Sequence, residues 1–188
     1  MKKGVFILGS IFAIILAFMF DKQILTSIVN NRVEFLNSFI ILITYIGSFY
    51  GILFIGMLLY LYDRKWNNLA IYIAVLLGAL SIGLAIKYTI LRARPDPETF
   101  MVFSNLIKNT PSFPSTHAIA TFSVYSVVQK YYPKLAEIWL PFGVLVLFSR
   151  LYLGLHYPSD IVFGALLGYF IGAFVLGKFG NKLEKGLF

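Results

Sequence analysis

The chain has 188 residues, of which 59% are hydrophobic and only 13% are charged. Water-soluble domains carry about 25% charged residues, so this composition excludes an ordinary soluble fold and predicts a membrane protein. The net charge is +8, but the basic residues lie at the ends of apolar runs and form no separate basic domain, which argues against nucleic acid as a partner. The absence of cysteine excludes disulfides and cysteine-ligated metal sites.

Six apolar segments follow one another along the chain, and each is long enough to cross a membrane as a helix. They are 4–20, 38–62, 68–91, 115–132, 138–155 and 159–179. Because backbone in lipid must hydrogen-bond to itself, we expect an all-α integral membrane protein, a six-helix transmembrane bundle that forms one domain over residues 1–188. The first segment is longer than the apolar part of a signal peptide, and no small-residue cleavage site follows it, so we interpret it as a retained span. Residues 100–107, between the third and fourth spans, are apolar enough to form a short interfacial helical segment.

Glycine recurs at helical spacing in two places, at Gly47 and Gly51 and in the row Gly164, Gly168 and Gly172. Rows of small residues let membrane helices approach closely. We therefore expect these glycines to serve packing and to have no catalytic role.

Lysine and arginine predict the orientation in the membrane. With the amino terminus in the cytoplasm, most of the basic residues outside the polar clusters described next fall on the cytoplasmic side, as the positive-inside rule requires. We therefore expect a multi-pass protein of the cytoplasmic (inner) membrane with both termini in the cytoplasm.

Three polar clusters stand out, because charged groups in or near a membrane are costly and usually functional. The first runs from Lys87 to Arg94-Pro95, the second is 114–117 and the third is 149–160. Under the predicted orientation, all three lie at the non-cytoplasmic ends of their spans and can converge on one site. Lys87 and Arg94 are seven residues apart, so they would share one helical face if the third span continued that far.

These residue types suit the transfer of a phosphate group. Cations neutralise phosphate oxygens, and arginine does so bidentately. A helix amino terminus also binds anions, and the fourth span begins in the second cluster. The candidate phosphate-binding residues are Lys87, Arg94, Ser115, Thr116 and Arg150.

The chain has two histidines, His117 and His156, and each falls in a polar cluster. Covalent phosphoryl transfer needs a nucleophile and a general acid. Asp160, four residues after His156, can hold one ring nitrogen and leave the other free to attack, whereas His117 has no acidic neighbour in the sequence and better suits the acid. Each residue also has a structural interpretation, as a snorkelling cation or a helix-start hydrogen bond, but the joint occurrence of three clusters favours one catalytic site.

The clusters resemble the three-part signature of the type 2 phosphatidic acid phosphatase superfamily, which is K-x6-R-P, then P-S-G-H, then S-R-x5-H-x3-D. The matching residues in this chain are Lys87, Arg94 and Pro95, then Pro114, Ser115, Thr116 and His117, then Ser149, Arg150, His156 and Asp160. The resemblance implies metal-independent cleavage of a phosphate ester or pyrophosphate, with His156 as nucleophile, Asp160 orienting it, His117 as general acid and the cations holding phosphate. Thr116 stands where the family has glycine, and threonine suffices there if the position supplies only an amide N–H. Soluble haloperoxidase relatives share the signature, but the apolar composition argues against that class.

Three functional hypotheses remain open from the sequence. The first is a lipid phosphatase acting on lipid A 1-phosphate, undecaprenyl diphosphate, phosphatidylglycerophosphate or phosphatidic acid. The second is a phosphotransferase of the same superfamily that passes the phosphate to another lipid. The third is a transporter, which is less favoured because the charges gather at one face and the two halves of the chain show no matching broken spans. Beyond a phosphorylated lipid and the bilayer, we expect no cofactor, metal or obligate protein partner, and we expect the site on the periplasmic or extracellular face.

Overall fold

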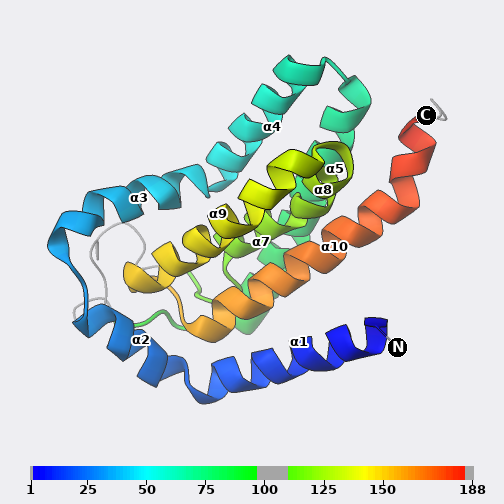
Figure 1. Ribbon diagram of the computed structural model, residues 1–188. Helices are drawn as coiled ribbons and strands as arrows, with labels where there is room; N and C mark the ends of the chain where they lie inside the picture. Colours follow the sequence, from blue (N-terminus) through cyan, green and yellow to red (C-terminus); the bar gives the residue numbers. More distant parts are fainter. Residues whose placement is uncertain (1, 97–109, 185–188) are drawn as a thin grey trace.

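Every regular element that the computed structural model describes, over residues 2–96 and 110–184, is a helix (Figure 1). In chain order the elements are α1 (Lys2–Met19), α2 (Asp21–Asn30), the 3-10 helix η1 (Glu34–Leu36), α3 (Asn37–Ile46), α4 (Phe49–Asp63), α5 (Trp66–Ile90), α7 (Thr116–Ser123), α8 (Tyr125–Tyr131), α9 (Pro133–Tyr152) and α10 (Pro158–Glu184). The all-α prediction is confirmed. The predicted interfacial segment 100–107 lies outside the described residues.

Within the described residues, three helices, α5, α9 and α10, are individually long and apolar enough to cross a membrane. The number rises to five if each of two bent pairs counts as one span: α1 with α2, bent by 67°, and η1–α3 with α4, bent by 63°. Large apolar side chains on α1, α4 and α5 remain exposed, as expected of surfaces that face lipid. The protein is therefore an integral membrane protein, but the predicted count of six spans is not confirmed.

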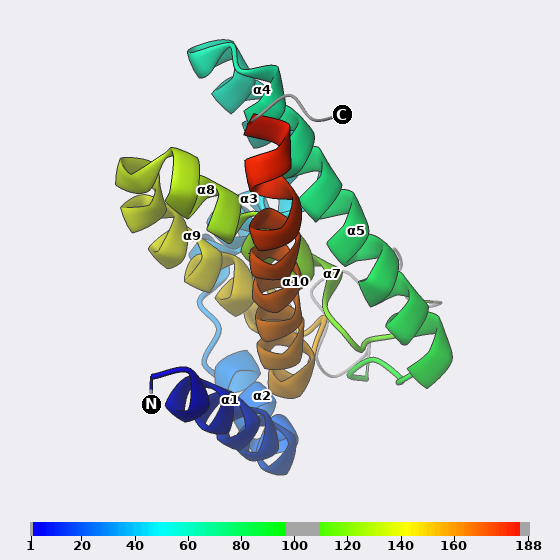
Figure 2. The same cartoon turned by 90° about the vertical axis from the view of Figure 1, so that its right-hand side faces the viewer.

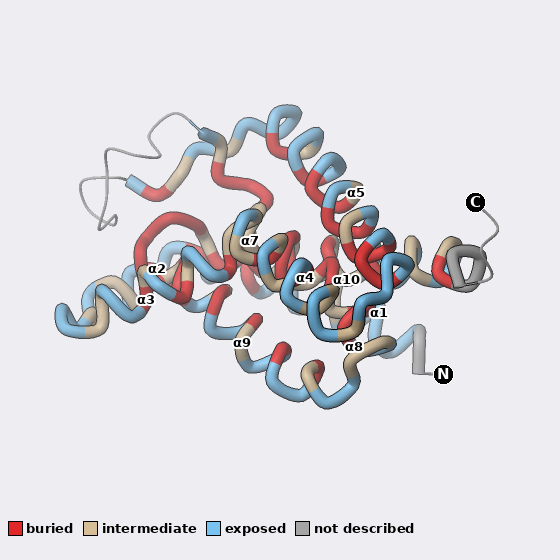
Figure 3. Tube along the Cα trace, turned by 90° about the horizontal axis from the view of Figure 1, so that it is seen from above, coloured by how far each residue is buried: buried red, intermediate tan, exposed pale blue. Residues whose placement is uncertain are grey.

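The predicted span 115–132 consists of two short helices, α7 and α8, of 8 and 7 residues. At their junction the hydroxyls of Ser123 and Ser126 donate to the carbonyls of Ala120 (3.1 Å) and Ser123 (3.3 Å), and serine bonding back to the preceding turn bends helices. Most of α7 is buried, because α4, α5, α9 and α10 pack around it (Figures 2 and 3). A segment enclosed by protein tolerates a break that a lipid-facing helix would not.

The glycine row of α10 lies directly against α7. A Cβ atom at Gly164 would come within 2.8 Å of the Ser115 carbonyl oxygen, and one at Gly168 within 2.6 Å of the Ile119 carbonyl oxygen. Gly172 is equally crowded by the backbone at the end of α7. The packing interpretation of this row is confirmed, because any larger residue would push the two helices apart.

The bundle has two distinct ends. In Figure 1 both chain termini and the turn between α4 and α5 lie toward the right of the view, and the turn between α9 and α10 lies toward the left. The end that contains the α9–α10 turn also receives the carboxyl end of α5 and the amino end of α7, so the three predicted polar clusters meet there.

Candidate active site

The predicted site residues come together, although they are spread over more than seventy positions of the chain. His117 lies within electrostatic range of Arg150, His156, Arg94 and Lys87. Their four segments are the end of α5, the loop after it, the start of α7 and the α9–α10 turn. The packing of the helices therefore brings the three motifs together, so that their charged and titratable side chains form one group.

Lys87 and Arg94 reach this group by different routes. The helix α5 ends at Ile90, and Leu91 adopts a left-handed conformation with φ 52°, so the expectation of a continuous helical face from Lys87 to Arg94 is wrong. Lys87, which is 4% exposed, donates from Nζ to the carbonyl oxygens of Pro111 (2.8 Å) and Ser112 (3.1 Å). These two bonds use two of its three N–H donors and aim the ammonium group across the loop.

Arg94 is a loop residue held by backbone and side-chain oxygens. Its Nε donates to the Thr110 carbonyl (2.9 Å), its Nη2 to the Thr110 hydroxyl (3.0 Å) and its Nη1 to the Leu155 carbonyl (2.6 Å). The same Nη1 lies 3.4 Å from His156 Nε2. The guanidinium is thus fixed in front of one ring nitrogen of His156, where it can share a substrate oxygen with that ring.

The amino end of α7 supplies the second cluster. Ser115 is fully buried, its N–H donates to the Asp160 carbonyl (3.1 Å), and its Oγ has no hydrogen-bond partner. Thr116 is the first residue of α7. In the described part of the chain, only Arg64 and Leu91 among non-glycine residues have positive φ, so threonine causes no backbone strain at the position where the family signature has glycine.

Arg150 comes from the last turn of α9 and is 3% exposed. Its Nε is buried without a hydrogen-bond partner. The preceding Ser149 is bonded to Thr44 Oγ1 on α3 (2.6 Å) and donates to the Val146 carbonyl (2.7 Å), so its hydroxyl ties α9 to α3. A buried guanidinium N–H and the buried Ser115 hydroxyl, both unpaired, are donors that an anionic ligand would satisfy.

His156 and Asp160 sit on either side of the α10 start. Pro158 is the first residue of α10, as proline at a first helical position allows, and the Tyr157 N–H donates to Asp160 Oδ2 (2.9 Å). His156 is 1% exposed, and its Nδ1 lies 3.4 Å from Asp160 Oδ2 without a hydrogen-bond partner. The predicted pair is therefore adjacent but not joined by a short hydrogen bond, a geometry that catalytic pairs often show before substrate binds.

Asp160 is held mainly by residues that the sequence analysis did not assign to the site. Ser112 Oγ donates to Asp160 Oδ2, and Arg92 Nη1 donates to Asp160 Oδ1 at 2.7 Å. Neither Arg92 nor Ser112 belongs to the three-part signature. Their only sequence signal is position: one lies two residues before Arg94 and the other two residues before the second cluster.

The electrostatic setting keeps His156 neutral. Burial, followed by the positive charges of Arg94, Arg150 and Lys87, holds the pKa of His156 well below its ordinary value near 6.5. Burial also lowers the pKa of Arg94 to about 10, opposed by the negative charge of Asp160, so this guanidinium stays charged at neutral pH. A neutral imidazole thus lies beside a charged guanidinium, an arrangement that suits attack on a bound phosphate.

Among residues 2–96 and 110–184, no group of three or more His, Asp or Glu residues is placed to hold a metal ion. A cavity of about 540 Å³ opens beside the site and is lined by Asp21, Arg92 and Tyr157 among others. A larger cavity of about 660 Å³ lies at the opposite end of the bundle, where the α4–α5 turn meets the end of α8.

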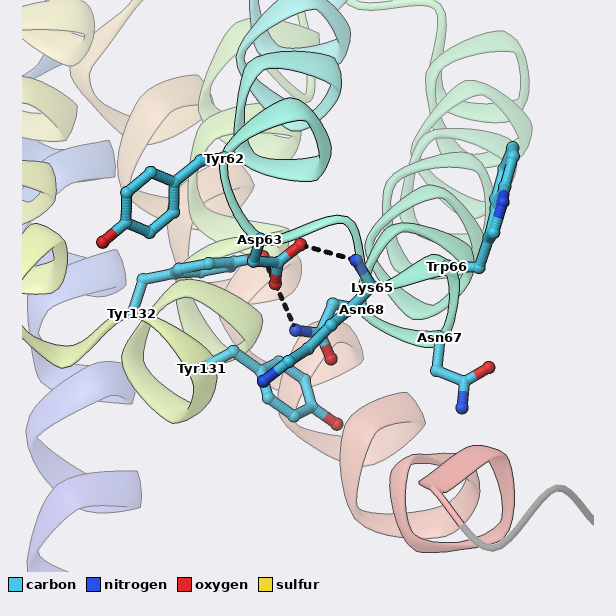
Figure 4. A pocket seen from close by; sticks show the side chains of 8 residues that line it. All are labelled: Tyr62, Asp63, Lys65, Trp66, Asn67, Asn68, Tyr131 and Tyr132. Atoms are coloured by element: carbon cyan, nitrogen blue, oxygen red, sulfur yellow. Dashed lines mark hydrogen bonds between the residues drawn. The ribbon is translucent and has the colours of Figure 1, made fainter.

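The cavity at the opposite end has a structural explanation. Figure 4 shows Asp63 pointing toward Lys65 and Asn68; its carboxylate accepts from the Lys65 N–H (2.9 Å), from Asn68 Nδ2 (2.6 Å) and from the Tyr132 hydroxyl (2.7 Å). These bonds tie the α4–α5 turn to the α8–α9 corner. None of the predicted phosphate-binding or catalytic residues lines this cavity, so its size alone does not make it the active site.

Residues 68–184 match the PAP2 superfamily. The chain is a member of the PAP2 superfamily. This PAP2 protein is 29% identical over 181 residues to phosphatidylglycerophosphatase B of Bacillus subtilis (strain 168), a match that covers 88% of the chain and 85% of that protein. It is 30% identical over 129 residues to the bacitracin transport permease protein BcrC of Bacillus licheniformis, which covers 64% of the chain and 62% of that protein, less than two thirds of its length.

A solved structure extends the similarity to the whole fold. The crystal structure of a transmembrane PAP2-type phosphatidylglycerolphosphate phosphatase from Bacillus subtilis superposes with a TM-score of 0.73 at 27% sequence identity, and the match covers 97% of this chain and 98% of that one. The named PAP2 relatives include lipid and polyprenyl phosphatases. This PAP2 protein is accordingly a phosphatase-family member embedded in a membrane.

Proposed function

We propose that the protein is a lipid phosphatase that cleaves a phosphate monoester or pyrophosphate on a membrane lipid through a phosphohistidine intermediate and without a metal ion. The observation that carries the proposal is the meeting of Lys87, Arg94 and Arg150 with the two histidines at one end of the bundle. Three cations match the three non-bridging oxygens of a phosphate, and they supply the positive charge that a metal ion would otherwise bring.

In the proposed reaction, Nε2 of His156 attacks phosphorus, the bond from phosphorus to the leaving oxygen breaks, and His117 protonates that oxygen. Lys87, Arg94 and Arg150 neutralise the phosphate oxygens as charge builds in the transition state. Water then attacks the phosphohistidine and gives a proton to His117. Inorganic phosphate leaves, and His156 returns to its neutral state.

The candidate substrates are lipid A 1-phosphate, undecaprenyl diphosphate, phosphatidylglycerophosphate and phosphatidic acid. The site residues recognise phosphate, so they do not choose among these lipids. The name of the Bacillus subtilis relative, which aligns with 88% of the chain, makes phosphatidylglycerophosphate the first to test. A lipid-to-lipid phosphotransferase is the alternative, and it would yield a phosphorylated acceptor instead of free phosphate.

We expect the purified protein in detergent to release inorganic phosphate from at least one of the four lipids, with and without EDTA. The cations of the site do not dissociate on chelation, so the rate in EDTA should stay within about twofold of the untreated rate. The measurement is kcat/KM for each lipid by phosphate release, with lipid products identified by mass spectrometry. Loss of activity in EDTA and its recovery with a divalent ion would contradict metal independence. Appearance of a phosphorylated acceptor would favour the transferase, and a pure transporter would release no phosphate at all.

We further propose that the site opens to the periplasmic or extracellular side of the cytoplasmic membrane. Basic residues favour cytoplasmic termini, and the site lies at the end of the bundle away from both termini (Figure 1). A site at this end of the bundle would receive the phosphate of a lipid whose acyl chains remain in the bilayer.

Single-cysteine labelling tests this orientation, because the native chain has no cysteine. Gln23 is exposed on α2 beside the site, and Asn67 is exposed at the opposite end of the bundle. In intact cells, or spheroplasts where an outer membrane is present, Gln23→Cys should react with an impermeant maleimide and Asn67→Cys should react only after permeabilisation. The reverse pattern would place the site on the cytoplasmic face.

A further inference from the structure

Arg92 joins the first bend of the chain to the carboxylate beside His156. Its Nη2 donates to Asp21 Oδ2 at 2.6 Å, and its Nη1 donates to Asp160 Oδ1 at 2.7 Å and to Ser159 Oγ at 2.6 Å. Asp21 is the first residue of α2 and is 6% exposed, and Asp160 is fully buried. One guanidinium therefore bridges two buried carboxylates that lie 139 positions apart in the sequence.

Ser159 closes the network on the Asp21 side. Its N–H donates to Asp21 Oδ1 at 2.8 Å and its hydroxyl to Asp21 Oδ2 at 2.6 Å. Asp21 thus accepts two hydrogen bonds from the first turn of α10 as well as the ion pair from Arg92. These bonds fix the position of Arg92 relative to Asp160, since both depend on the same helix start.

The guanidinium of Arg92 is committed to this network. Both terminal nitrogens are bonded to carboxylates, and the rings of Tyr157 and Phe18 lie 4.2 Å and 5.4 Å from its central carbon, within cation–π range. Arg92 is therefore a part of the buried network and not a cation that extends toward the lipid head groups. Lys22 and Gln23, in contrast, line the adjoining cavity with exposed side chains.

The charge balance explains why two carboxylates share one arginine. A buried carboxylate needs a cation and hydrogen bonds to remain ionised. If Arg92 were paired with Asp160 alone, it would neutralise the charge that supports His156 during attack. With Asp21 drawing on the same guanidinium, the positive charge of Arg92 is divided between two carboxylates, and Asp160 Oδ2 lies 3.4 Å from Nδ1 of His156.

We propose that Asp21 and Arg92 are positioning residues: Arg92 holds Asp160 ionised with its Oδ2 turned toward His156, and Asp21 holds Arg92 in place. The proposal rests on the proposed function of His156 as nucleophile. It assigns a catalytic task to the α1–α2 bend, which lies outside residues 68–184 that match the family.

The test compares Asp21→Asn, Asp21→Glu and Arg92→Lys with the control Thr89→Val, a change at an exposed hydroxyl on α5 that bonds within its own helix. Asp21→Asn should lower kcat by about 10–100-fold, because a displacement of about 1 Å in a reacting group can cost about 100-fold in rate, and should change KM by less than about threefold. Asp21→Glu should recover most of the loss because it restores the charge. Arg92→Lys should resemble Asp21→Asn, because an ammonium group lacks the fork that bridges two carboxylates. Thr89→Val should match the wild type.

Rapid-quench measurement of phosphohistidine separates positioning from folding. The amplitude of its burst counts intact sites, and its rate reports the attack by His156. Positioning predicts a slower burst of unchanged amplitude in Asp21→Asn. A smaller amplitude at the wild-type rate would show a structural tie only, and would overturn the proposal. If Asp21→Asn does not fold, the burst rates of Asp21→Glu and Arg92→Lys decide: a normal rate in Arg92→Lys sinks the idea. A wild-type protein with no phosphohistidine would instead refute the proposed function itself.

Discussion

His156→Ala should abolish phosphate release, with a fall in kcat of about 10⁴-fold or more, comparable to the loss of a nucleophile from other coupled catalytic groups. The imidazole is buried, and its Nε2 lies 3.4 Å from the Arg94 guanidinium, so we expect no other side chain to take the same position against a bound phosphate. The measurement is phosphate release under saturating lipid, together with acid quenching of the wild-type protein in mid-turnover. The wild type should carry an acid-labile, base-stable phosphoryl group on His156.

Two controls make the His156 result interpretable. Thr89→Val alters an exposed hydroxyl near the same end of α5 that bonds only within its own helix, and it should leave kcat unchanged. The melting temperature of His156→Ala should remain close to that of the wild type in the same detergent, so that loss of activity reflects lost chemistry. Near-normal turnover in the alanine variant would end the phosphohistidine mechanism.

His117→Ala should slow hydrolysis of a lipid phosphate by about 10²–10⁴-fold, the usual contribution of a general acid. The reason is that an alkoxide is a poor leaving group unless it is protonated as the bond breaks. With an aryl phosphate such as p-nitrophenyl phosphate, whose leaving group is stable as an anion, formation of the phosphohistidine should slow by less than about tenfold. The measurement is the burst rate with each substrate in His117→Ala and in the wild type.

The second half of the reaction gives an independent check on His117. If His117 also takes the proton from the attacking water, the aryl substrate should leave His117→Ala trapped as the phosphohistidine. Arg150→Lys offers a contrast, because weaker phosphate binding should slow both substrates alike. Equal losses for the lipid and the aryl substrate in His117→Ala would contradict the role of general acid and favour a phosphate-binding role for this histidine.

The sequence predicted those elements whose pattern is local. Apolar runs of sufficient length located α1, α5, α9 and α10 to within a few residues, because lipid imposes both helix and minimum length. The sequence did not predict the helix breaks in segments that are surrounded by protein and not by lipid. The break at Val124 and the 63° bend between α3 and α4 follow from packing inside the bundle, which hydropathy does not report.

In the site, too, local patterns were predicted from the sequence and features that depend on packing were not. The signature residues were identified because their spacing is short and their types are unusual in a membrane segment. The end of α5 at Ile90 was missed, since nothing in the sequence demands the left-handed turn at Leu91. Asp21 and Arg92 were missed as a pair because they are 71 positions apart, and only the fold brings the start of α2 to the start of α10.

The glycine row of α10 has a consequence for how the enzyme tolerates change. Residues 116 and 117 open α7, Asp160 opens α10, and the backbones of the two helices touch along this row. The spacing between the proposed acid and the proposed nucleophile is thus set by contacts that extend well into the bundle. A displacement of about 1 Å in a reacting group can cost about 100-fold in rate. One methyl group added at Gly168, two helical turns beyond Asp160, should therefore slow the reaction without touching the site. We therefore expect substitutions at Gly164, Gly168 and Gly172 to lower activity, although a substrate would contact none of them.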